Sequence, residues 1–266
     1  MNLYWLEQCA EDLPKENHWL SGTELHFLDD LRFSKRRADW RLGRWTAKQA
    51  LAAYLNSPHS PAALAKIEVR PALSGAPEAF FENRPAPVTI SLSHRNDKAL
   101  CVVAPCVADL GCDLEQVEPR SDAFIADYFT PEEQALVMRH TSAERLLLAA
   151  LLWSGKESAL KALRTGLRLD TRSVIVEPVD LSLDRDGWGP LQVHHRGAKK
   201  FNGWWQIVDG MVRTVVADPP PMSLIHLQVT TDLFDGTPNG SESGLAASAS
   251  GNWEAQDLAQ VTLLAV

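Results

Sequence analysis

The sequence predicts an α+β fold, because helical and strand-forming segments are grouped along the chain instead of alternating strictly. Apolar residues at helical spacing run through residues 19–56, and strand-like runs follow as far as residue 114. A second helical region begins near residue 130, and further strand-like runs occupy residues 172–217. The two halves therefore have a similar content of elements, although no repeat is visible in the letters themselves.

The first helical region carries an apolar stripe made of Leu28, Leu31, Trp40, Ala47, Leu51 and Leu55. Ser34 and the basic cluster after it mark a break between two helices, and Asn56-Ser57-Pro58 ends the region. Strand-like runs follow at residues 67–69, 78–81 and 88–93. Residues 99–104 are apolar throughout, as in a buried strand. Residues 107–114 are expected to be its antiparallel neighbour.

The second half opens with a clear helix start. In Thr130-Pro131-Glu132-Glu133, a capping Thr is followed by Pro at the first helical position and Glu at the third. A long helix is expected over about residues 143–164, with Gly166 ending it. Asp209-Gly210 is typical of a hairpin turn, and strands are expected at residues 172–178, 203–208 and 211–217.

Composition places the chain among soluble globular proteins. Of its 266 residues, 45% are apolar and 23% are charged, which is ordinary for that class. No apolar run is long enough for a transmembrane helix, and the N-terminus lacks the features of a signal peptide. The four cysteines form no CxxC pair, so neither a zinc site nor a disulfide framework is indicated. We therefore expect a cytoplasmic protein without a membrane partner.

The order of the elements, together with the charge and composition of the C-terminal part, suggests three regions. Residues 1–106 are predicted to be an N-terminal half, residues 107–221 a C-terminal half, and residues 222–266 an acidic, partly flexible extension. Residues 32–48 hold seven basic residues against the single acid Asp39. Such a stripe suits a polyphosphate, an acidic partner protein or a solvated helix face. Nucleic acid is the least supported partner, because the rest of the chain has no basic excess and no recognised nucleic-acid-binding motif.

A pair of carboxylates lies at the end of the run at residues 107–114. In Gly111-Cys112-Asp113-Leu114-Glu115, the side chains of Asp113 and Glu115 point to the same side of a strand. Neighbouring carboxylates repel each other unless a cation lies between them or one holds a proton. Mg²⁺ takes hard oxygen ligands of this kind together with substrate phosphate. The alternative is a strand end that emerges into solvent, where both residues are tolerated.

A second charged motif lies on the predicted long helix. Trp153, Glu157 and Lys161 are spaced by four residues and therefore share one face. The plain interpretation is an ion pair between Glu157 and Lys161, which stabilises a helix only slightly. Residues 146–152, however, are apolar all round, which favours a buried helix. A buried helix that also carries Lys156 needs partners for its charges, and a metal with a polyphosphate would supply them.

A Ser-His element ends the strand at residues 88–93. Ser93 and His94 in Ser91-Leu92-Ser93-His94 could bind a phosphate oxygen. A single histidine at a strand end is more often structural, so its functional interpretation depends on the neighbouring motifs.

These motifs together resemble the 4′-phosphopantetheinyl transferases, specifically the surfactin-type branch. The resemblance rests on the order and spacing of Gly111-x-Asp113-x-Glu115 and Trp153-x-x-Lys156-Glu157-Ser158-x-x-Lys161, with the Ser-His element upstream. Gly43-Arg44 with Lys48 is similar to the basic segment of that branch, and Phe129 to Glu133 resembles the segment between its main motifs. The resemblance covers roughly residues 3–217.

The resemblance implies an enzyme that moves the 4′-phosphopantetheine arm of coenzyme A to a serine of an apo acyl or peptidyl carrier protein and releases 3′,5′-ADP. It implies a monomer built as a pseudo-dimer of two similar α/β halves, with coenzyme A in the cleft between them. Asp113, Glu115 and Glu157 would hold Mg²⁺ on the pyrophosphate. Glu157 would also be the base for the carrier serine, and Lys161 would neutralise charge on the breaking pyrophosphate.

The same resemblance implies the contacts to coenzyme A. Ser93 and His94 would touch its phosphates, Arg44 and Lys48 would approach the 3′-phosphate, and Lys156 is placed among the same contacts. One departure is that many relatives have Gly-Lys-Pro where this chain has Gly75-Ala76-Pro77, so one expected cation is missing. Two alternatives stay open: another Mg²⁺-dependent phosphotransferase, and a non-catalytic protein that binds coenzyme A or carrier proteins. The carrier protein itself is not indicated.

Overall fold

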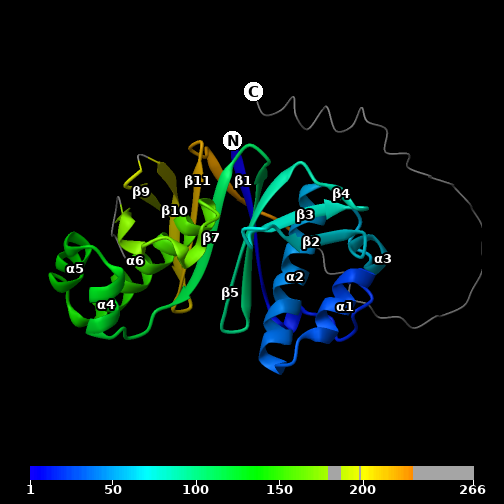
Figure 1. Cartoon of the computed structure of the whole chain (residues 1–266), viewed down its shortest axis with the longest axis horizontal. Helices are drawn as coiled ribbons and strands as arrows, with labels where there is room; N and C mark the ends of the chain where they lie inside the picture. Colours follow the sequence, from blue (N-terminus) through cyan, green and yellow to red (C-terminus); the bar gives the residue numbers. More distant parts are fainter. Residues whose placement is uncertain (179–186, 198, 230–266) are drawn as a thin grey trace, which may run out of the picture. The chain divides into compact units, whose positions relative to one another are not determined.

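The α+β class is confirmed by the computed structural model, which describes residues 1–178, 187–197 and 199–229. Met1 to Val229 form one compact unit in which sheets are covered by helices (Figure 1). The elements of the first half are β1 (Asn2–Cys9), α1 (Gly22–Asp30), α2 (Ser34–Tyr54), α3 (Pro61–Leu64), β2 (Ile67–Pro71), β3 (Pro77–Phe81), β4 (Arg84–Pro85), β5 (Val88–Arg95) and β6 (Lys98–Pro105).

The second half begins with the strand that carries the paired carboxylates. Its elements are β7 (Asp109–Gln116), α4 (Asp122–Tyr128), α5 (Pro131–Met138), α6 (Ser142–Ala162), β8 (Val174–Pro178), β9 (Gly189–His195), β10 (Lys200–Val208) and β11 (Met211–Asp218). A last strand, β12 (Ser223–His226), returns to the first half. Among the described residues, no helix combines the length and apolar character needed to cross a membrane.

Two larger sheets organise these elements. The first has the order β12-β1-β6-β5, in which β1 and β12 are parallel and the other pairs antiparallel. The second is antiparallel, with the order β7-β11-β10-β9-β8. A smaller sheet has the order β2-β3-β4. Helix α2 lies against the first sheet and α6 against the second (Figure 1).

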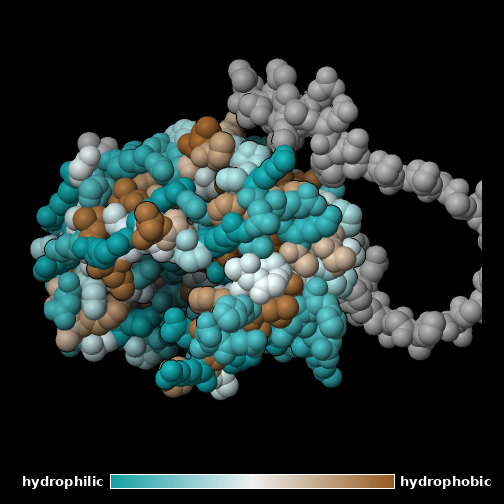
Figure 2. All heavy atoms as spheres, turned by 45° about the vertical axis from the view of Figure 1, so that its right-hand side comes forward, coloured by the Kyte–Doolittle hydropathy of each residue, from teal (hydrophilic) through white to brown (hydrophobic). Residues whose placement is uncertain are grey.

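Apolar side chains from both larger sheets form a shared core. Leu3, Leu100 and Val102 contribute from the first sheet, and Cys112 and Val215 from the second. Arg213 on β11 adds a polar link, because its Nε lies 2.6 Å from Oε2 of Glu7 on β1. The face in Figure 2 is mostly hydrophilic, with apolar residues in small separate patches.

The position of β7 corrects the prediction that residues 107–114 pair with residues 99–104. Strand β6 pairs with β1 and β5, whereas β7 pairs with β11, where Asp113 lies opposite Thr214. The chain therefore passes from one sheet to the other after β6. Strand β5 still lies close to β7, because the backbone N–H of Cys112 donates to Oγ of Ser91 at 2.9 Å.

The end of α6 also differs from the prediction, which placed it near residue 164 with Gly166 as the stop. The helix ends at Ala162, and the first residue with positive φ is Arg164, at +55°. The N–H of Arg164 donates to Lys161 O at 2.9 Å, and the N–H of Thr165 donates to Leu160 O at 3.1 Å. These two bonds form a Schellman motif, which satisfies the last carbonyls of the helix.

A repeat of sequence becomes visible once the elements are compared, contrary to the prediction that the letters show none. Trp45 and Lys48 on α2 recur as Trp153 and Lys156 on α6, 108 residues later. Leu-Glu-Gln at residues 6–8 on β1 recurs at residues 114–116 on β7, at the same interval. Each of the two larger sheets thus has a corresponding strand and a corresponding covering helix.

The predicted extension at residues 222–266 is partly inside the fold. Ser223 pairs with Asn2 and His226 with Trp5, so β12 belongs to the first sheet. The remainder, from residue 230 onward, lies outside the described residues, and so does the flexibility that was predicted for it.

Candidate functional site

The paired carboxylates and the charged face of α6 come together where α6 crosses β7. Gly111 allows this approach, because a Cβ at its position would lie 1.7 Å from the backbone oxygen of Ser158 on α6. Ser154 and Ser158 fix the helix from the same side, since their hydroxyl oxygens lie 2.8 and 2.7 Å from Oγ1 of Thr214 on β11. The first position of the GxDxE motif is therefore a packing requirement of the site.

Asp113 is the centre of the site. It is 6% exposed, and its Oδ1 accepts from Lys161 Nζ at 2.7 Å and from Ser93 Oγ at 2.8 Å. Lys161 Nζ also donates to Cys112 O at 3.0 Å. Burial lowers the pKa of Lys161, but Asp113, Cys112 and Glu157 together outweigh it, so the pKa is raised and the amine stays charged. The structure thus joins three residues that the sequence analysis took from three separate motifs.

Glu115, two residues further along β7, is held by arginines. Arg120 Nη2 lies 2.9 Å and Arg95 Nε 3.4 Å from Oε1 of Glu115. Both guanidinium groups also reach Oε1 of Glu118, at 3.3 and 2.8 Å. A cation at Glu115 would therefore meet two positive charges already in place.

Glu157 lies on α6, one turn before Lys161. Burial raises the pKa of Glu157, Asp113 and Glu115 raise it further, and Lys161 lowers it. The plain interpretation, an ion pair between Glu157 and Lys161, does not describe the lysine, which binds Asp113 at 2.7 Å. The shift shows that three carboxylates share one electrostatic environment.

A divalent cation at this junction would need oxygen ligands that the protein itself leaves unsatisfied. Among the described residues, no group of three or more His, Cys, Asp or Glu side chains is arranged as a ready metal site. The second oxygen of Asp113, Oδ2, is nevertheless buried and has no hydrogen-bond partner in the described part of the chain. A buried carboxylate oxygen without a donor is costly, and a hard cation would satisfy it. This oxygen of Asp113 therefore fits a hard cation such as Mg²⁺.

A basic hollow of about 680 Å³ opens next to Asp113. Ser93 and His94 on β5 form one wall, and α2 forms another. The α2 wall carries both charge and aromatic surface, contributed by Phe33, Lys35, Arg36, Trp40 and Arg44. Asp39 lines the same wall and lies 3.4 Å from Lys35 Nζ, so the wall keeps a positive excess but Lys35 is partly compensated. Of the contacts predicted for a phosphate-rich ligand, Ser93, His94 and Arg44 are placed together here.

The electrostatics of this hollow favour an anion. Helix α2 starts after Phe33 without a side-chain cap, and its first turn carries Lys35 and Arg36 but no acid. Positive residues at a helix N-terminus add to the positive end of the helix dipole instead of compensating it. Nε of Arg44 is buried without a hydrogen-bond partner among the described residues, and its guanidinium lies 5.0 Å from the ring centre of Trp40.

Lys48 and Lys156 are not brought to the site, which corrects their predicted contact with coenzyme A. Both side chains are 0% exposed. Lys48 Nζ lies 2.5 Å from Glu24 Oε2, and Lys156 Nζ lies 2.8 Å from Glu133 Oε2. Because each ammonium is enclosed by its own carboxylate and by backbone carbonyls, neither can reach a ligand in this arrangement.

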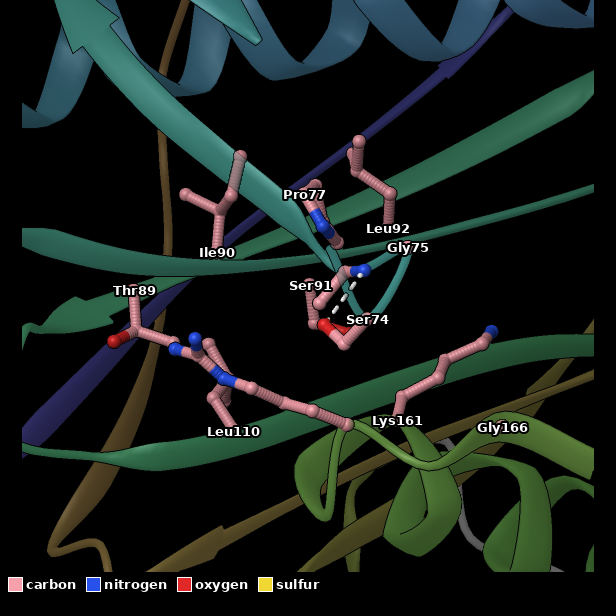
Figure 3. A pocket seen from close by; sticks show the side chains of 12 residues that line it. Ser74, Gly75, Pro77, Thr89, Ile90, Ser91, Leu92, Leu110, Lys161 and Gly166 are labelled. Carbon is pink, nitrogen blue, oxygen red and sulfur yellow. Dashed lines mark hydrogen bonds between the residues drawn. The ribbon is translucent and has the colours of Figure 1, made fainter. Parts of the chain in front are cut away.

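A second hollow, of about 260 Å³, extends from the other side of Lys161. Figure 3 shows Lys161 rising from α6 on one side and the loop with Ser74 and Gly75 opposite it. Apolar side chains of β5 and β7 line the hollow, with Arg164 at the end of α6. The loop is the place where Ala76 stands instead of the expected lysine.

Sequence reasoning missed several residues that now line the site. Lys35 and Arg36 were noted only as part of a basic stripe, and Trp40 only as an apolar position. The absence of a capping residue before Ser34 was a usable signal, because an uncapped basic helix start favours a bound anion. Arg95 and Arg120 carried no signal, since nothing in the letters places them beside Glu115.

Comparisons with known proteins bear on the second half of the chain. Residues 109–216 match the family model described as the 4′-phosphopantetheinyl transferase superfamily. This segment runs from β7 to β11 and includes Asp113, Glu115, Glu157 and Lys161. No curated protein matches the chain.

Among solved structures, the chain is similar to a holo-(acyl-carrier-protein) synthase from Bacillus anthracis str. Ames in complex with CoA (3′,5′-ADP). The sequences are 22% identical, and the match covers 38% of this chain and 91% of that chain, with a TM-score of 0.32.

Proposed function

We propose that this protein transfers the 4′-phosphopantetheine arm of coenzyme A to a serine of an acyl or peptidyl carrier protein and releases 3′,5′-ADP. The observation that carries the proposal is the junction at Asp113, where Lys161 and Ser93 converge on one carboxylate beside a basic hollow. The match of residues 109–216 to the transferase superfamily supports it.

The basic hollow suits the nucleotide end of coenzyme A. Lys35, Arg36 and Arg44 supply positive charge for the 3′-phosphate, and the ring of Trp40 offers a flat apolar surface for the base. His94 follows Ser93 on β5, which forms the opposite wall. The diphosphate would then extend from this hollow towards Lys161, which carries the next available positive charge.

Asp113, Glu115 and Glu157 would hold Mg²⁺ at this point. When bound, the ion neutralises charge on the diphosphate. Glu115 would have to be shared with Arg95 and Arg120, so Asp113 and Glu157 are the principal ligands in this proposal. Lys161 stays charged because of Asp113, and its ammonium stabilises the negative charge that develops on the departing phosphate.

Glu157 acts as the base for the carrier serine. A raised pKa makes its carboxylate a better proton acceptor near neutral pH. As the serine oxygen forms its bond to phosphorus, the serine proton passes to Glu157. The bond between that phosphorus and the bridging oxygen of the diphosphate breaks, and 3′,5′-ADP leaves with the bond electrons.

The repeated features support a duplicated architecture. Corresponding Trp and Lys residues on α2 and α6, and corresponding strands β1 and β7, are expected of a pseudo-dimer of two similar halves. At the position of Glu157, α2 carries Gln49, and at that of Lys161 it carries Ala53. In this proposal the first half supplies most of the nucleotide site and the second half supplies the chemistry.

The test is a transfer assay read by mass spectrometry. The full chain is incubated with coenzyme A, Mg²⁺ and an apo carrier protein, with fatty-acid, polyketide and peptide-synthetase carriers tried separately. The expected result is a mass gain of one phosphopantetheine group on at least one carrier, lost in Asp113→Asn and Glu157→Gln. Glu177→Gln serves as the control, because Glu177 is an exposed carboxylate away from the site.

Other outcomes separate the alternatives. Coenzyme A binding without transfer to any carrier would contradict the transferase proposal and favour a non-catalytic binding protein. Cleavage of the diphosphate without a carrier would favour another Mg²⁺-dependent phosphotransferase or hydrolase.

A further inference from the structure

The C-terminal end of α6 carries an arginine in a backbone conformation that favours glycine. In a Schellman motif, the residue after the helix cap takes positive φ, and this position is usually Gly or Asn. Here it is Arg164, with φ of +55°. At the corresponding end of α2 the residue is Asn56, with φ of +51°, and the N–H of Ser57 donates to Ala52 O at 2.8 Å. The two halves thus share the motif, but only α6 places a long cationic side chain in it.

Positive φ is unfavourable for a residue other than glycine, and such strain is often found at functional sites. The surroundings of the Arg164 side chain are therefore relevant. Arg164 lines the smaller hollow together with Lys161. Its ion pair with Glu78 does not account for the residue, because the two atoms are 3.9 Å apart and both side chains are nearly half exposed. The guanidinium is therefore available to a ligand in the hollow.

The charge balance of the hollow leaves room for a second cation. Lys161 is already bound to Asp113 at 2.7 Å, so its charge is partly compensated within the protein. On the opposite wall, Arg168 Nη2 donates to Ser74 O at 3.0 Å and holds the loop, where Ala76 contributes no charge. A diphosphate entering beside Lys161 would therefore meet one protein cation there, already shared with Asp113, and a second cation on the wall of the hollow would add to its binding.

We propose that Arg164 is a substrate-binding residue that contacts the diphosphate of the nucleotide ligand, next to Lys161. This inference rests on the proposed function and extends it to a residue beyond the charged motifs. A guanidinium suits the role because it can donate two parallel hydrogen bonds to phosphate oxygens.

The test compares binding of two probes, coenzyme A and dephospho-coenzyme A, which lacks the 3′-phosphate, by calorimetry on the full chain. In Arg164→Gly the Kd for both probes is expected to rise about tenfold, because a charged hydrogen bond is lost. The Tm is expected to rise by about 2 to 4 °C, since glycine relieves the positive φ. Loss of affinity with a gain in stability would not follow from a merely structural role.

Two further variants control the assignment. Asn56→Gly makes the same backbone change at the end of α2 and is expected to leave both Kd values unchanged. Lys35→Ala with Arg36→Ala is expected to weaken coenzyme A binding while sparing dephospho-coenzyme A. If Arg164→Gly weakened the binding of coenzyme A but not of dephospho-coenzyme A, Arg164 would contact the 3′-phosphate instead of the diphosphate, and the inference would be wrong.

The failure of this inference differs from the failure of the proposed function. A wild-type chain that transfers the arm, alongside an Arg164→Gly variant with unchanged Kd values, would overturn only the role of Arg164. A wild-type chain that binds neither probe would overturn both.

Discussion

At the residue scale, the two oxygens of Asp113 are in opposite situations. Oδ1 accepts from both Lys161 and Ser93, whereas Oδ2 is buried without a hydrogen-bond partner among the described residues. One oxygen is therefore satisfied by the protein, and the other is the oxygen that a cation would occupy in the proposed function. This asymmetry places the carboxylate in a fixed orientation before any ligand arrives.

Asp113→Asn should therefore weaken metal binding before any substrate is added. We expect the Kd for Mn²⁺, a spectroscopic substitute for Mg²⁺, to rise at least about tenfold, because a buried anionic ligand is replaced by a neutral one. Electron paramagnetic resonance of free Mn²⁺ measures this directly. Glu177→Gln removes an exposed carboxylate and should leave the Kd unchanged, whereas equal weakening in both variants would point to a general charge effect.

Glu157 should cost the protein stability at neutral pH. Because burial and then Asp113 raise its pKa, the folded state holds the proton more tightly than the unfolded state does. Protonated Glu157 therefore contributes stability to the folded state. This contribution is fully present below the ordinary pKa of 4.5, and it is lost as the pH rises through the raised pKa of Glu157. In buffer with EDTA, Glu157→Gln should therefore have a higher Tm than the wild type at pH 7, with the difference shrinking towards pH 4.

Calorimetry across this pH range provides the check. A Tm difference that stays constant with pH would show that the gain comes from packing instead of from the charge of Glu157. Mg²⁺ should raise the Tm of the wild type more than that of the variant.

Several site residues were predictable because their chemistry is local to a short motif. Asp113, Glu157 and Lys161 share one junction as the motifs indicated, although Lys161 binds Asp113 and not Glu157. Lys48 and Lys156 were misplaced because a motif does not reveal which side of a helix faces the ligand. Their burial depends on Glu24 and Glu133, which lie on other helices.

At the scale of elements, both halves contain the same buried connection. Glu24 caps α1 and accepts from the N–H of Val69 on β2, and Glu133 caps α5 and accepts from the N–H of Val176 on β8. A lysine of the long helix binds each of these carboxylates. Each ion pair therefore joins a short helix, a long helix and a strand.

Double-mutant cycles should show that the two connections are equivalent. Removing one partner leaves a buried charge, so Lys156→Met or Glu133→Gln alone should cost about 3 to 5 kcal/mol of unfolding free energy. Together they should cost less than the sum, with a coupling of about 1 to 3 kcal/mol. Urea denaturation gives these values, and Lys48→Met with Glu24→Gln supplies the matched cycle. A coupling near zero in one half would show that only the other depends on its ion pair.

Capping residues predicted the starts of some helices well, because a cap depends on residues close together in the sequence. They carry no information on which distant strands pair. The start of α5 at Thr130 and Glu133 is confirmed, since the side chain of each bonds the backbone N–H of the other. The same pattern at Ser21 and Glu24 opens α1 and was overlooked. Strand β7 was assigned to the wrong neighbour, because its apolar residues fit any buried sheet and its partner, β11, lies about a hundred residues away.

At the scale of the whole molecule, negative charge is concentrated far along the sequence from the site. The chain carries −8, and five acids with no Lys or Arg lie after residue 229. Coenzyme A is also an anion, so this charge should slow its approach at low ionic strength.

Neutralising these acids should accelerate coenzyme A association. The substitutions are Asp232→Asn, Asp235→Asn, Glu242→Gln, Glu254→Gln and Asp257→Asn. We expect the association rate to rise about two- to threefold near 10 mM salt and to match the wild type above about 0.5 M. Stopped-flow fluorescence of the tryptophans measures the rate. An increase that persists at high salt would indicate a local effect instead of a long-range one.

The pairing of β1 with β6 and β12 has a consequence for the order of events on the ribosome. Strand β1 leaves the exit tunnel before the other described elements, yet its parallel neighbour β12 follows more than 200 residues later. The second sheet, by contrast, needs only strands between Asp109 and Asp218, and its last strand to be made, β11, pairs between β7 and β10. The edge of β1 that pairs with β12 therefore stays unpaired until almost the whole described chain has been translated. Newly made chains are exposed to aggregation through that edge for most of their synthesis.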